Sequence, residues 1–376
     1  MIILHFIEKQ VWEEESKSGK IGMNAIIGHG FIPCVNVADV KSLDLTFSTL
    51  NDYMILCIDT DKIDAEIKFE NYGDGELKEP NIYDTIPVDA VIAMFPYTFD
   101  QNDRFVPTRE IMDYELINLA LEKLHIKYES HQHFHDGTTS TIILLNKQYI
   151  IKKASPELLK AEVTFATEYV RIPKLQKVAA YGEDYRYVIY DFVPGDVMHT
   201  VSDFKDLTDN LKLITDQYKD FPLEGYGYIS HPVESWDDFL REEVNAAKRS
   251  FSEVDYLLPQ VEEAIKELAK YPFDRKLLHG DFGTHNFISS NNKFVAAIDP
   301  IPLVGDKLYD LLYALVSNID LIPYLSMGFL AGYTGDSEEK ITAMLTVVLY
   351  CRICRCAIYD KEWIEPYLAF GERIFN

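Results

Sequence analysis

The chain has 376 residues, and 47% of them are hydrophobic, which is enough for two or three domains with apolar cores. Its 61 Asp and Glu residues outnumber 36 Lys and Arg, for a net charge of −25. This balance argues against nucleic acid or an anionic membrane as a main partner, because both require basic patches. A cationic substrate is compatible with it, but a solvated acidic surface is the simpler explanation.

The first 112 residues alternate short β-rich segments with turns and predict a separate α+β domain. The expected strands are Ile2–Phe6, Phe31–Cys34, Tyr53–Ile58, Ile63–Phe69 and Val88–Phe95. The apolar run at the N-terminus is too short for a signal peptide and has no basic region before it. No later stretch approaches the roughly twenty apolar residues that cross a bilayer. We therefore expect a cytoplasmic protein without a membrane partner.

Several short motifs in this segment resemble a small bacterial family of unknown function with an ADP-ribosyltransferase-like fold. They are His5, Trp12, Gly30-Phe31-Ile32-x-Cys34, Pro80-x-Ile82-Tyr83 and the run from Ile86 to Val91. The family usually has His at the positions of Pro33 and Asn81. Because both are absent, we expect a structural or substrate-shaping role for this domain and not a second activity.

A second part, residues 113–198, reads as a β-rich lobe. Residues 114–125 have helical spacing of apolar side chains and predict a linking helix. The loop at 135–140 precedes a strand and can lay backbone N–H groups over phosphates, which makes Gly137, Thr138 and Ser140 candidate nucleotide-binding residues. The next strand ends in Lys152 and Lys153, whose side chains point to opposite faces.

A helix is expected from Pro156 to Tyr169, and one of its acidic residues could pair with the lysine, Lys152 or Lys153, that contacts the phosphates. Glu162 lies ten residues after Lys152, and Glu168 is the weaker candidate. Strands at 178–181 and 187–190 then form an antiparallel pair that leads into Asp191, Phe192 and Val193.

The third part, residues 199–376, is mainly helical, and one of its helices should begin after Ser235, a good N-cap. Acidic residues around this start could bind a cationic acceptor, or could simply suit a helix N-terminus. They are Glu234, Asp237, Asp238, Glu242 and Glu243. The motif of Cys351, Cys354 and Cys356 has no other Cys or His cluster nearby, so we expect buried thiols in a helix and not a metal site.

The strongest motif runs from His279 to Asn286, and Asp299 follows after a short apolar run. We expect a strand, a tight loop and a hairpin that brings Asp281, Asn286 and Asp299 together. The Asp281 carboxylate can accept a proton from an attacking hydroxyl. Asn286 and Asp299 supply the hard oxygen ligands that Mg²⁺ prefers. These groups suit phosphoryl transfer, in which catalysis is mostly positioning and charge neutralisation.

With these residues, the chain resembles the aminoglycoside phosphotransferase and choline kinase-like superfamily, most closely its antibiotic-kinase branch. Asp-x-x-x-x-Asn matches the protein-kinase catalytic loop, with Ile298-Asp299-Pro300 in place of Asp-Phe-Gly. The resemblance implies a bilobal, protein-kinase-like α+β fold, with a β-rich N-lobe and a helical C-lobe, after the small domain. It selects Lys152 over Lys153, and implies that Asp306, in the motif Gly305 to Leu311, supports the catalytic loop. It also makes the backbone groups of Asp191 to Val193 candidates for reading the purine edge of a nucleotide.

The function implied is a small-molecule kinase, a phosphotransferase with an alcohol acceptor, that uses ATP or GTP with Mg²⁺. An aminoglycoside-like antibiotic is the favoured acceptor. The alternatives are a kinase for another metabolite such as choline, methylthioribose, homoserine or a sugar, and a nucleotide-binding regulator without turnover. A kinase acting on protein is a further alternative. The sequence does not distinguish ATP from GTP.

Overall fold

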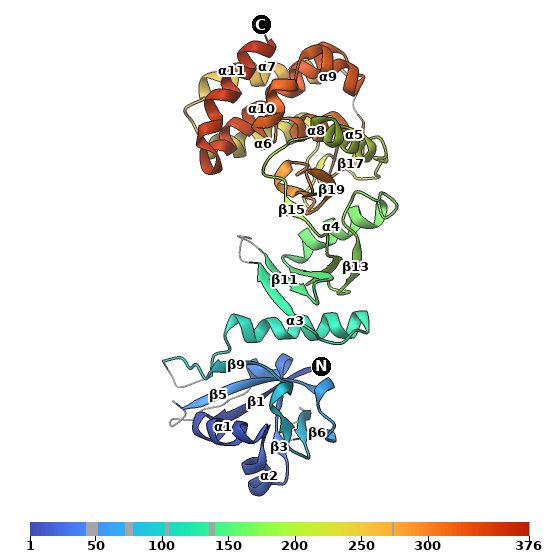
Figure 1. The fold of residues 1–376 in the computed structure, drawn as a ribbon. Coiled ribbons are helices and arrows are strands. Elements are labelled where there is room, and N and C mark those ends of the chain that lie inside the picture. The colour runs from blue at the N-terminus through green and yellow to red at the C-terminus, as the bar shows by residue number, and fades with distance from the viewer. Residues whose placement is uncertain (43–51, 72–77, 102–104, 135–139, 273, 376) are drawn as a thin grey trace. The chain divides into compact units, whose positions relative to one another are not determined.

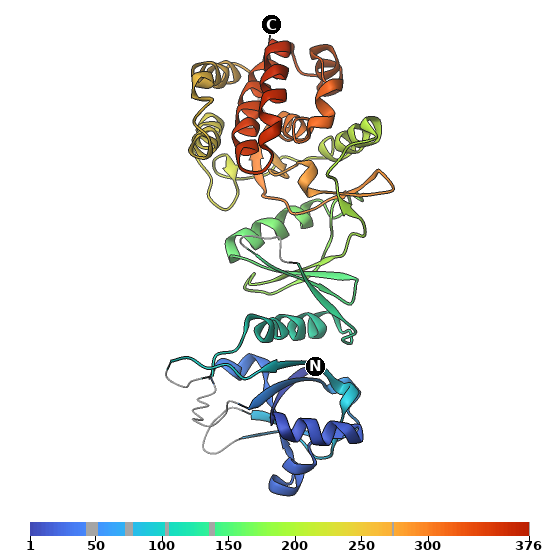
Figure 2. The same cartoon turned by 60° about the vertical axis from the view of Figure 1, so that its left-hand side comes forward.

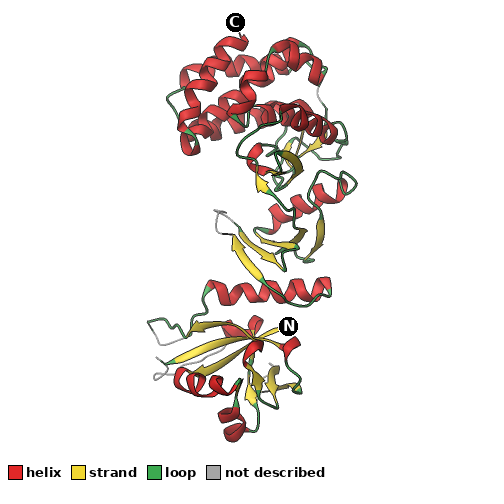
Figure 3. Ribbon diagram, in the orientation of Figure 1, coloured by secondary structure: helices red, strands yellow, loops and turns green. Residues whose placement is uncertain are grey.

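The computed structural model describes residues 1–42, 52–71, 78–101, 105–134, 140–272 and 274–375. The chain divides into two compact units, Met1–Ile151 and Lys152–Asn376. The predicted domain limits at residues 112 and 198 remain predictions. Figure 3 distinguishes the strands, which make up much of the first unit, from the helices that dominate the C-terminal half of the second.

The first unit is built on an antiparallel sheet in the order β4-β1-β5-β9. Its strands are β1 (Ile2–Glu8), β4 (Val35–Asn36), β5 (Tyr53–Asp59) and β9 (Val91–Pro96). In the long pair of β1 with β5, Leu4 lies opposite Cys57, and both side chains are fully buried. Helix α1 (Lys9–Glu15) follows β1 in the chain, and α2 (Met23–His29) follows a short strand, β2 (Lys20–Ile21) (Figure 1).

Smaller strand pairs complete this part of the first unit. A three-stranded sheet has the order β3-β7-β6, and β2 pairs with β8. The strands are β2 (Lys20–Ile21), β3 (Ile32–Pro33), β6 (Ile67–Asn71), β7 (Lys78–Ile82) and β8 (Ile86–Pro87). The strand predicted to start at Ile63 thus starts four residues later, because a short 3-10 turn (Thr60–Lys62) and irregular backbone precede it.

The predicted linking helix is present as α3 (Arg109–Leu124), and it starts five residues before the expected Tyr114. The Thr108 hydroxyl accepts from the backbone N–H of Ile111 at 3.4 Å, so an N-cap sets this start. The first unit then contains an antiparallel hairpin of β10 (His131–Phe134) and β11 (Thr141–Leu145). Strand β12 (Tyr149–Lys153) contains the boundary between the units.

The second unit starts with the elements expected of a nucleotide-binding lobe. Helix α4 (Pro156–Glu168) has Ser155 as its N-cap and Pro156 in its first turn. The strands β13 (Val178–Tyr181) and β14 (Val188–Asp191) form the predicted antiparallel pair. Two three-stranded sheets follow, in the orders β15-β18-β19 and β16-β20-β17. Their strands are β15 (Asp196–Val197), β16 (Gly227–Tyr228), β17 (Lys276–Leu278), β18 (Phe287–Ser290), β19 (Lys293–Ala297) and β20 (Leu303–Gly305).

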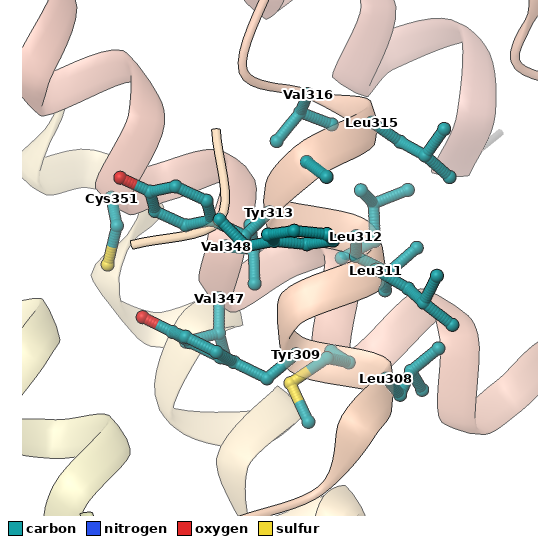
Figure 4. Packing of buried hydrophobic residues seen from close by; sticks show 14 of the residues in the cluster. Leu308, Tyr309, Leu311, Leu312, Tyr313, Leu315, Val316, Val347, Val348 and Cys351 are labelled. Carbon is teal, nitrogen blue, oxygen red and sulfur yellow. The ribbon is translucent and has the colours of Figure 1, made fainter. Parts of the chain in front are cut away.

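The helices of the second unit enclose a large apolar core around α10. They are α5 (Phe204–Thr215), α6 (Trp236–Ser250), α7 (Leu258–Leu268), α8 (Lys307–Leu315), α9 (Met327–Thr334), α10 (Glu338–Tyr359) and α11 (Ile364–Phe375). Helix α10 packs against α6, α7, α8 and α11, which gather around it in Figures 1 and 2. Figure 4 shows side chains of α8 meeting Val347, Val348 and Cys351 of α10 in this core.

Two sequence expectations for this region need correction. Gly328 and Gly332, expected to break the C-terminal helices, lie inside α9, and only Gly335 ends a helix, in the left-handed conformation with φ 79°. Helix α10 is also long and apolar enough to cross a membrane, although no such stretch was expected; 67% of its most apolar window is buried, as in a core helix. Its three cysteines are buried free thiols, as predicted.

Candidate active site

The catalytic loop is formed between β17 and the hairpin of β18 and β19. The side chain of Asp310, on α8, accepts from the backbone N–H of His279 at 2.8 Å and of Gly280 at 3.1 Å. It also accepts from the hydroxyl of Tyr218 at 2.8 Å. Asp310 is fully buried, and burial raises the pKa of its carboxyl to about 7. Three donors on one buried carboxyl fix the start of the loop.

The sequence assigned loop support to Asp306, and that expectation is wrong. Asp306 is the N-cap of α8, where its carboxylate accepts from the N–H of Leu308 at 2.9 Å and pairs with Lys340 at 2.7 Å. Asp310, one turn later, is the residue that bonds to the loop. Aspartate is a preferred N-cap, so the start of α8 was a readable signal for the role of Asp306.

Gly280 has a backbone conformation that would be strained in residues other than glycine. Its φ is 81°, in the left-handed region that favours glycine. A Cβ atom placed on it would lie 2.0 Å from the carbonyl oxygen of Ile301. The His-Gly-Asp sequence therefore follows from a close approach between the loop and the segment after Asp299.

His279 is a neutral structural residue of the loop. It is buried, and burial lowers the pKa of its ring to about 4. Its Nε2 lies 3.0 Å from the carbonyl oxygen of Ile298 and therefore carries the ring hydrogen. The backbone N–H of Ile298 in turn donates to the carbonyl of Asn286 at 2.9 Å. These two contacts tie the residues before Asp299 to both ends of the loop.

Asp281 is surrounded by hydrogen-bond donors. Its Oδ1 accepts from the hydroxyl of Tyr313 at 2.8 Å and lies 3.1 Å from Nε2 of His285. Its Oδ2 accepts from Nδ2 of Asn286 at 2.9 Å. Burial alone would raise the pKa of Asp281, but the contacts with His285 and Tyr313 and the charge of Arg355 lower it below its ordinary value. The carboxyl is therefore ionised at neutral pH.

The Lys152–Glu162 pair predicted from the sequence is present. Nζ of Lys152 lies 2.7 Å from Glu162, and it also contacts the carboxylate of Asp299. Burial would lower the pKa of Lys152, but Glu162 and Asp299 together outweigh burial and raise it. The second oxygen of Glu162 accepts from the hydroxyl of Tyr190, which the sequence did not single out. Lys153 is exposed, and Glu168 pairs with Lys219 at 2.6 Å at the surface.

The chemistry of Asn286 and Asp299 fits a divalent cation. The amide nitrogen of Asn286 is used on Asp281, which leaves its amide oxygen as a ligand. The carboxylate of Asp299 is half exposed, and only its Oδ1 contacts Lys152, so its second oxygen is available. Asp299 has φ 57°, a conformation that Asp and Asn tolerate better than most residues. An amide and a carboxylate oxygen are ligands suited to Mg²⁺.

The remaining predicted nucleotide contacts are placed only in part. Gly137 and Thr138 lie outside the described residues, and Ser140 is half-buried just before β11. The N–H of Asp191 donates to the carbonyl of Lys177 at 2.9 Å, and its carbonyl accepts from the side chain of Gln176 at 3.0 Å. A carbonyl can accept a second hydrogen bond, so this oxygen stays a candidate for the purine. Phe192 and Val193 follow β14 and are half-buried.

The acidic residues proposed for a cationic acceptor are partly committed to protein contacts. Glu243 lies 3.2 Å from Nη2 of Arg355 and accepts from the hydroxyl of Tyr228 at 2.9 Å. Asp238 accepts from the hydroxyl of Ser235 at 2.6 Å. Glu234 and Glu242 are exposed. Sequence reasoning missed Asp310, Tyr313 and Arg355, because only the packing of distant helices brings them to the loop.

Comparisons with known proteins cover both parts of the chain. Residues 134–340 match the family described as phosphotransferase enzyme family, and residues 6–94 match a family described as protein of unknown function (DUF952). No curated protein matches the chain. These matches confirm both resemblances inferred from the sequence motifs.

Three solved structures are among those similar to parts of the chain. A predicted fructosamine-3-kinase from Thermobifida fusca YX-ER1 is 15% identical, with a TM-score of 0.50 over 68% of this chain and 98% of that chain. The GDP complex of an aminoglycoside 2'-phosphotransferase is 15% identical, with a TM-score of 0.47 over 71% and 98%. A protein from Caulobacter crescentus is 14% identical, with a TM-score of 0.27 over 30% and 98%. The family match and the structure with a TM-score of 0.50 confirm the kinase-like fold predicted from the sequence.

Proposed function

The chain belongs to the phosphotransferase enzyme family, and we propose that it transfers the γ-phosphoryl group of ATP or GTP to a hydroxyl group of a small molecule. The observation that carries the proposal is that two pairs, Asp281 with Asn286 and Lys152 with Asp299, are brought together by the hairpin, through the backbone hydrogen bond from Ile298 to Asn286. Few other chemistries need an ionised carboxylate, two oxygen ligands and a buried lysine in one place.

In the proposed reaction, the acceptor hydroxyl gives its proton to Asp281 as its oxygen attacks the γ-phosphorus. A new P–O bond forms, the bond from the γ-phosphorus to the bridging oxygen breaks, and a nucleoside diphosphate leaves. Lys152, held by Glu162 at 2.7 Å, places a positive charge on the phosphates. Asn286 and Asp299 would hold Mg²⁺, which neutralises phosphate charge when bound. Carbonyl and N–H groups at Asp191 to Val193 would contact the purine.

An aminoglycoside-like antibiotic is the acceptor we propose first. The motif from His279 to Asn286 supports the antibiotic-kinase branch, and the net charge of −25 favours a polycationic acceptor. A sugar-like acceptor is the second candidate, because the fold match at a TM-score of 0.50 is to a predicted fructosamine-3-kinase. We further propose a cytoplasmic site of action, where nucleoside triphosphates are present and the five free thiols stay reduced.

The proposal is tested with a panel of aminoglycosides, amino alcohols and sugars, scored for consumption of ATP and GTP with and without Mg²⁺. Asp299→Asn is the matched variant, because Asn tolerates φ 57° whereas Ala would add strain. Replacing the carboxylate by a neutral amide removes a negative charge from the cation site and should lower Mg²⁺-dependent turnover about 100-fold. Asp184→Asn, at an exposed turn of the same unit, serves as the control and should behave like the wild type. Wild-type turnover in Asp299→Asn would show that the metal assignment is wrong, and Mg²⁺-dependent nucleotide binding without transfer to any acceptor would favour a regulator.

A further inference from the structure

A chain of polar side chains continues from Asp281 into the helical part of the second unit. The hydroxyl of Tyr313, on α8, donates to Oδ1 of Asp281 at 2.8 Å. Nη1 of Arg355, on α10, contacts that same hydroxyl oxygen, and its Nη2 lies 3.2 Å from Glu243 on α6. The other oxygen of Glu243 accepts from the hydroxyl of Tyr228 at 2.9 Å. Three helices thus reach the carboxylate through one connected path.

The direction of each hydrogen bond along this path is fixed by chemistry. A guanidinium has only donors, so Arg355 must donate to the oxygen of Tyr313. The hydroxyl hydrogen of Tyr313 must then point away from Arg355, toward Asp281. The guanidinium also lies over the ring of Tyr313, with 5.4 Å between its carbon and the ring centroid. Arg355 therefore holds both the ring and the hydroxyl of Tyr313 in place.

Because this path is largely buried, it should add little to the stability of the fold, but it can fix the orientation of the Asp281 carboxylate. The side chains of Tyr313 and Glu243 are buried, and that of Arg355 is 36% exposed. Removing an ion pair from water costs about as much as the attraction returns, so buried pairs add little net stability. Figure 4 shows Tyr313 packed beside Tyr309, with both hydroxyls on the side of Cys351, one turn before Arg355.

The oxygens of Asp281 are unequally used. Oδ1 contacts two donors, Tyr313 and His285, whereas Oδ2 contacts one, the amide of Asn286. A carboxylate has about four acceptor positions, two on each oxygen. The position that remains is therefore on Oδ2.

We propose that Tyr313, Arg355 and Glu243 form a positioning network that holds Oδ1 of Asp281, so that Oδ2 receives the proton of the acceptor hydroxyl. The network does not touch the reacting atoms. It acts by fixing the rotation of one carboxylate, and a small error in that rotation misplaces the proton acceptor. This inference rests on the proposed phosphotransferase function.

The test compares the steady-state kinetics of Tyr313→Phe and Arg355→Met with two matched controls. Tyr309→Phe removes a hydroxyl one turn earlier on α8 that bonds to no described residue. Arg352→Met removes a guanidinium one turn earlier on α10, which pairs with Asp360 at 3.5 Å and lies over Trp363. Loss of one hydrogen bond to a charged group should lower kcat about 10- to 100-fold in the first two variants. The nucleotide KM should stay within about twofold, because the phosphate contacts are unchanged.

Further variants separate positioning from folding. Arg355→Lys keeps one donor and the charge but loses the fork, so its kcat should fall between those of the wild type and Arg355→Met. The double variant Tyr313→Phe with Arg355→Met should be no slower than the worse single variant, since the two residues act as one unit. Both controls should keep the wild-type kcat, although Arg352→Met should lose some thermal stability with its contacts to Asp360 and Trp363. If Arg355→Met fails to fold, the nearly isosteric Tyr313→Phe still gives the answer.

Each outcome decides a different claim. If the wild-type protein transfers phosphate and Tyr313→Phe has the same kcat, the network is wrong, and the phosphotransferase function stands. An equal loss of kcat in Tyr309→Phe or Arg352→Met also overturns it, because the effect would then be general destabilisation. Absence of any Mg²⁺-dependent phosphoryl transfer in the wild type, to an acceptor or to water, overturns the proposed function and this inference with it.

Discussion

One polar cluster in the N-terminal unit joins neighbouring strands, whereas another in the second unit converges from separate helices on one carboxylate. Asn81, on β7, donates to Glu70 across 11 positions of sequence, and Tyr83, just after β7, donates to Glu70 across 13. In the second unit, Arg355 joins Tyr313 across 42 positions and Glu243 across 112. Cross-strand pairs maintain a sheet, but a convergence of distant elements orients a particular group.

Both units contain buried polar atoms without a described hydrogen-bond partner. They include Oε1 of Glu79 and Oδ1 of Asn81 in the first unit, and Nδ1 of His279 and Nε of Arg352 in the second. Both oxygens of Asp281, by comparison, have partners. The contrast that matters is therefore between local pairing of strands and the convergence on Asp281, which supports a chemical role for the second unit. Four substitutions, ordered from the largest expected effect to the smallest, can break or sharpen it.

Asp310→Ala should have the largest effect. It leaves the N–H groups of His279 and Gly280 and the hydroxyl of Tyr218 without their acceptor, inside the core. Each buried donor left unpaired costs about 1–3 kcal/mol, so the free energy of unfolding should fall by about 3 kcal/mol or more. Urea unfolding measures this loss of stability, and initial rates measure the loss of kcat expected when the catalytic loop is no longer held. In Asp306→Ala the free energy of unfolding should fall by only about 1 kcal/mol, because a helix N-cap is lost, and kcat should be unchanged. If Asp306→Ala lost as much kcat as Asp310→Ala, the assignment of loop support to Asp306 would be restored.

Glu162→Gln should weaken nucleotide binding. The substitution removes the charge that pairs with Lys152 at 2.7 Å, leaving Asp299 as the remaining anionic partner. A partly buried charge pair contributes about 2 kcal/mol, so the nucleotide KM should rise about 30-fold. Glu168→Gln, on the same helix but in a surface pair with Lys219, should change that KM less than about twofold. If the two variants raised the nucleotide KM equally, the proposed role of Lys152 in binding the phosphates would be wrong.

His131 should make the N-terminal unit sensitive to acid without affecting catalysis. Burial, helped by the neighbouring His133, lowers the pKa of His131 to about 4. A group with a lowered folded pKa takes up its proton first in the unfolded state, so stability is present above pH 6.5 and is lost toward pH 4. After allowance for partial exposure, the loss should be about 1.5 kcal/mol. Hydrogen exchange of β10 and β11 at pH 7 and pH 4.5 measures it, and His131→Phe should abolish the difference while kcat at pH 7 stays unchanged.

Glu79→Gln should have the smallest effect and should be slightly stabilising. Burial raises the pKa of Glu79, so its ionised form at pH 7 is disfavoured in the folded state. A carboxyl with a raised folded pKa loses stability as the pH rises from its unfolded value, and the neutral amide avoids this loss. We expect a gain of about 0.5 kcal/mol in urea unfolding at pH 7, with no change in kcat. A loss of kcat in this variant would contradict the structural role expected for the N-terminal domain.

The sequence predicted local features of the site well. The strand, loop and hairpin around His279 to Asn286 follow from alternating apolar runs and turn residues, which act over a few positions. The pair of Lys152 and Glu162 was predicted with the help of the family resemblance, which selected Lys152 over Lys153. The N-cap at Ser235 was also predicted, and its hydroxyl accepts from the N–H of Asp238 at 3.1 Å.

Features that depend on how helices pack were not predicted. Asp306 and Asp310 lie four residues apart in one motif, and the start of α8 decides that the first caps the helix while the second bonds to the loop. Tyr313 and Arg355 lie in apolar helices, where nothing in the local pattern distinguishes a positioning residue from a core residue. Long-range packing places these residues, and a single sequence contains no direct signal of it.

The most direct test of the account is phosphoryl transfer by Asp281→Asn. Nucleotide labelled at the γ-phosphate is mixed with the acceptor panel and Mg²⁺, and label in the acceptor is counted beside a separate measurement of nucleotide binding. Removal of a general base should lower transfer about 10²- to 10⁴-fold, with nucleotide binding unchanged, because Asp281 has no predicted contact with the nucleotide. Transfer at the wild-type rate by Asp281→Asn would contradict the central claim that this carboxylate receives the proton of the acceptor.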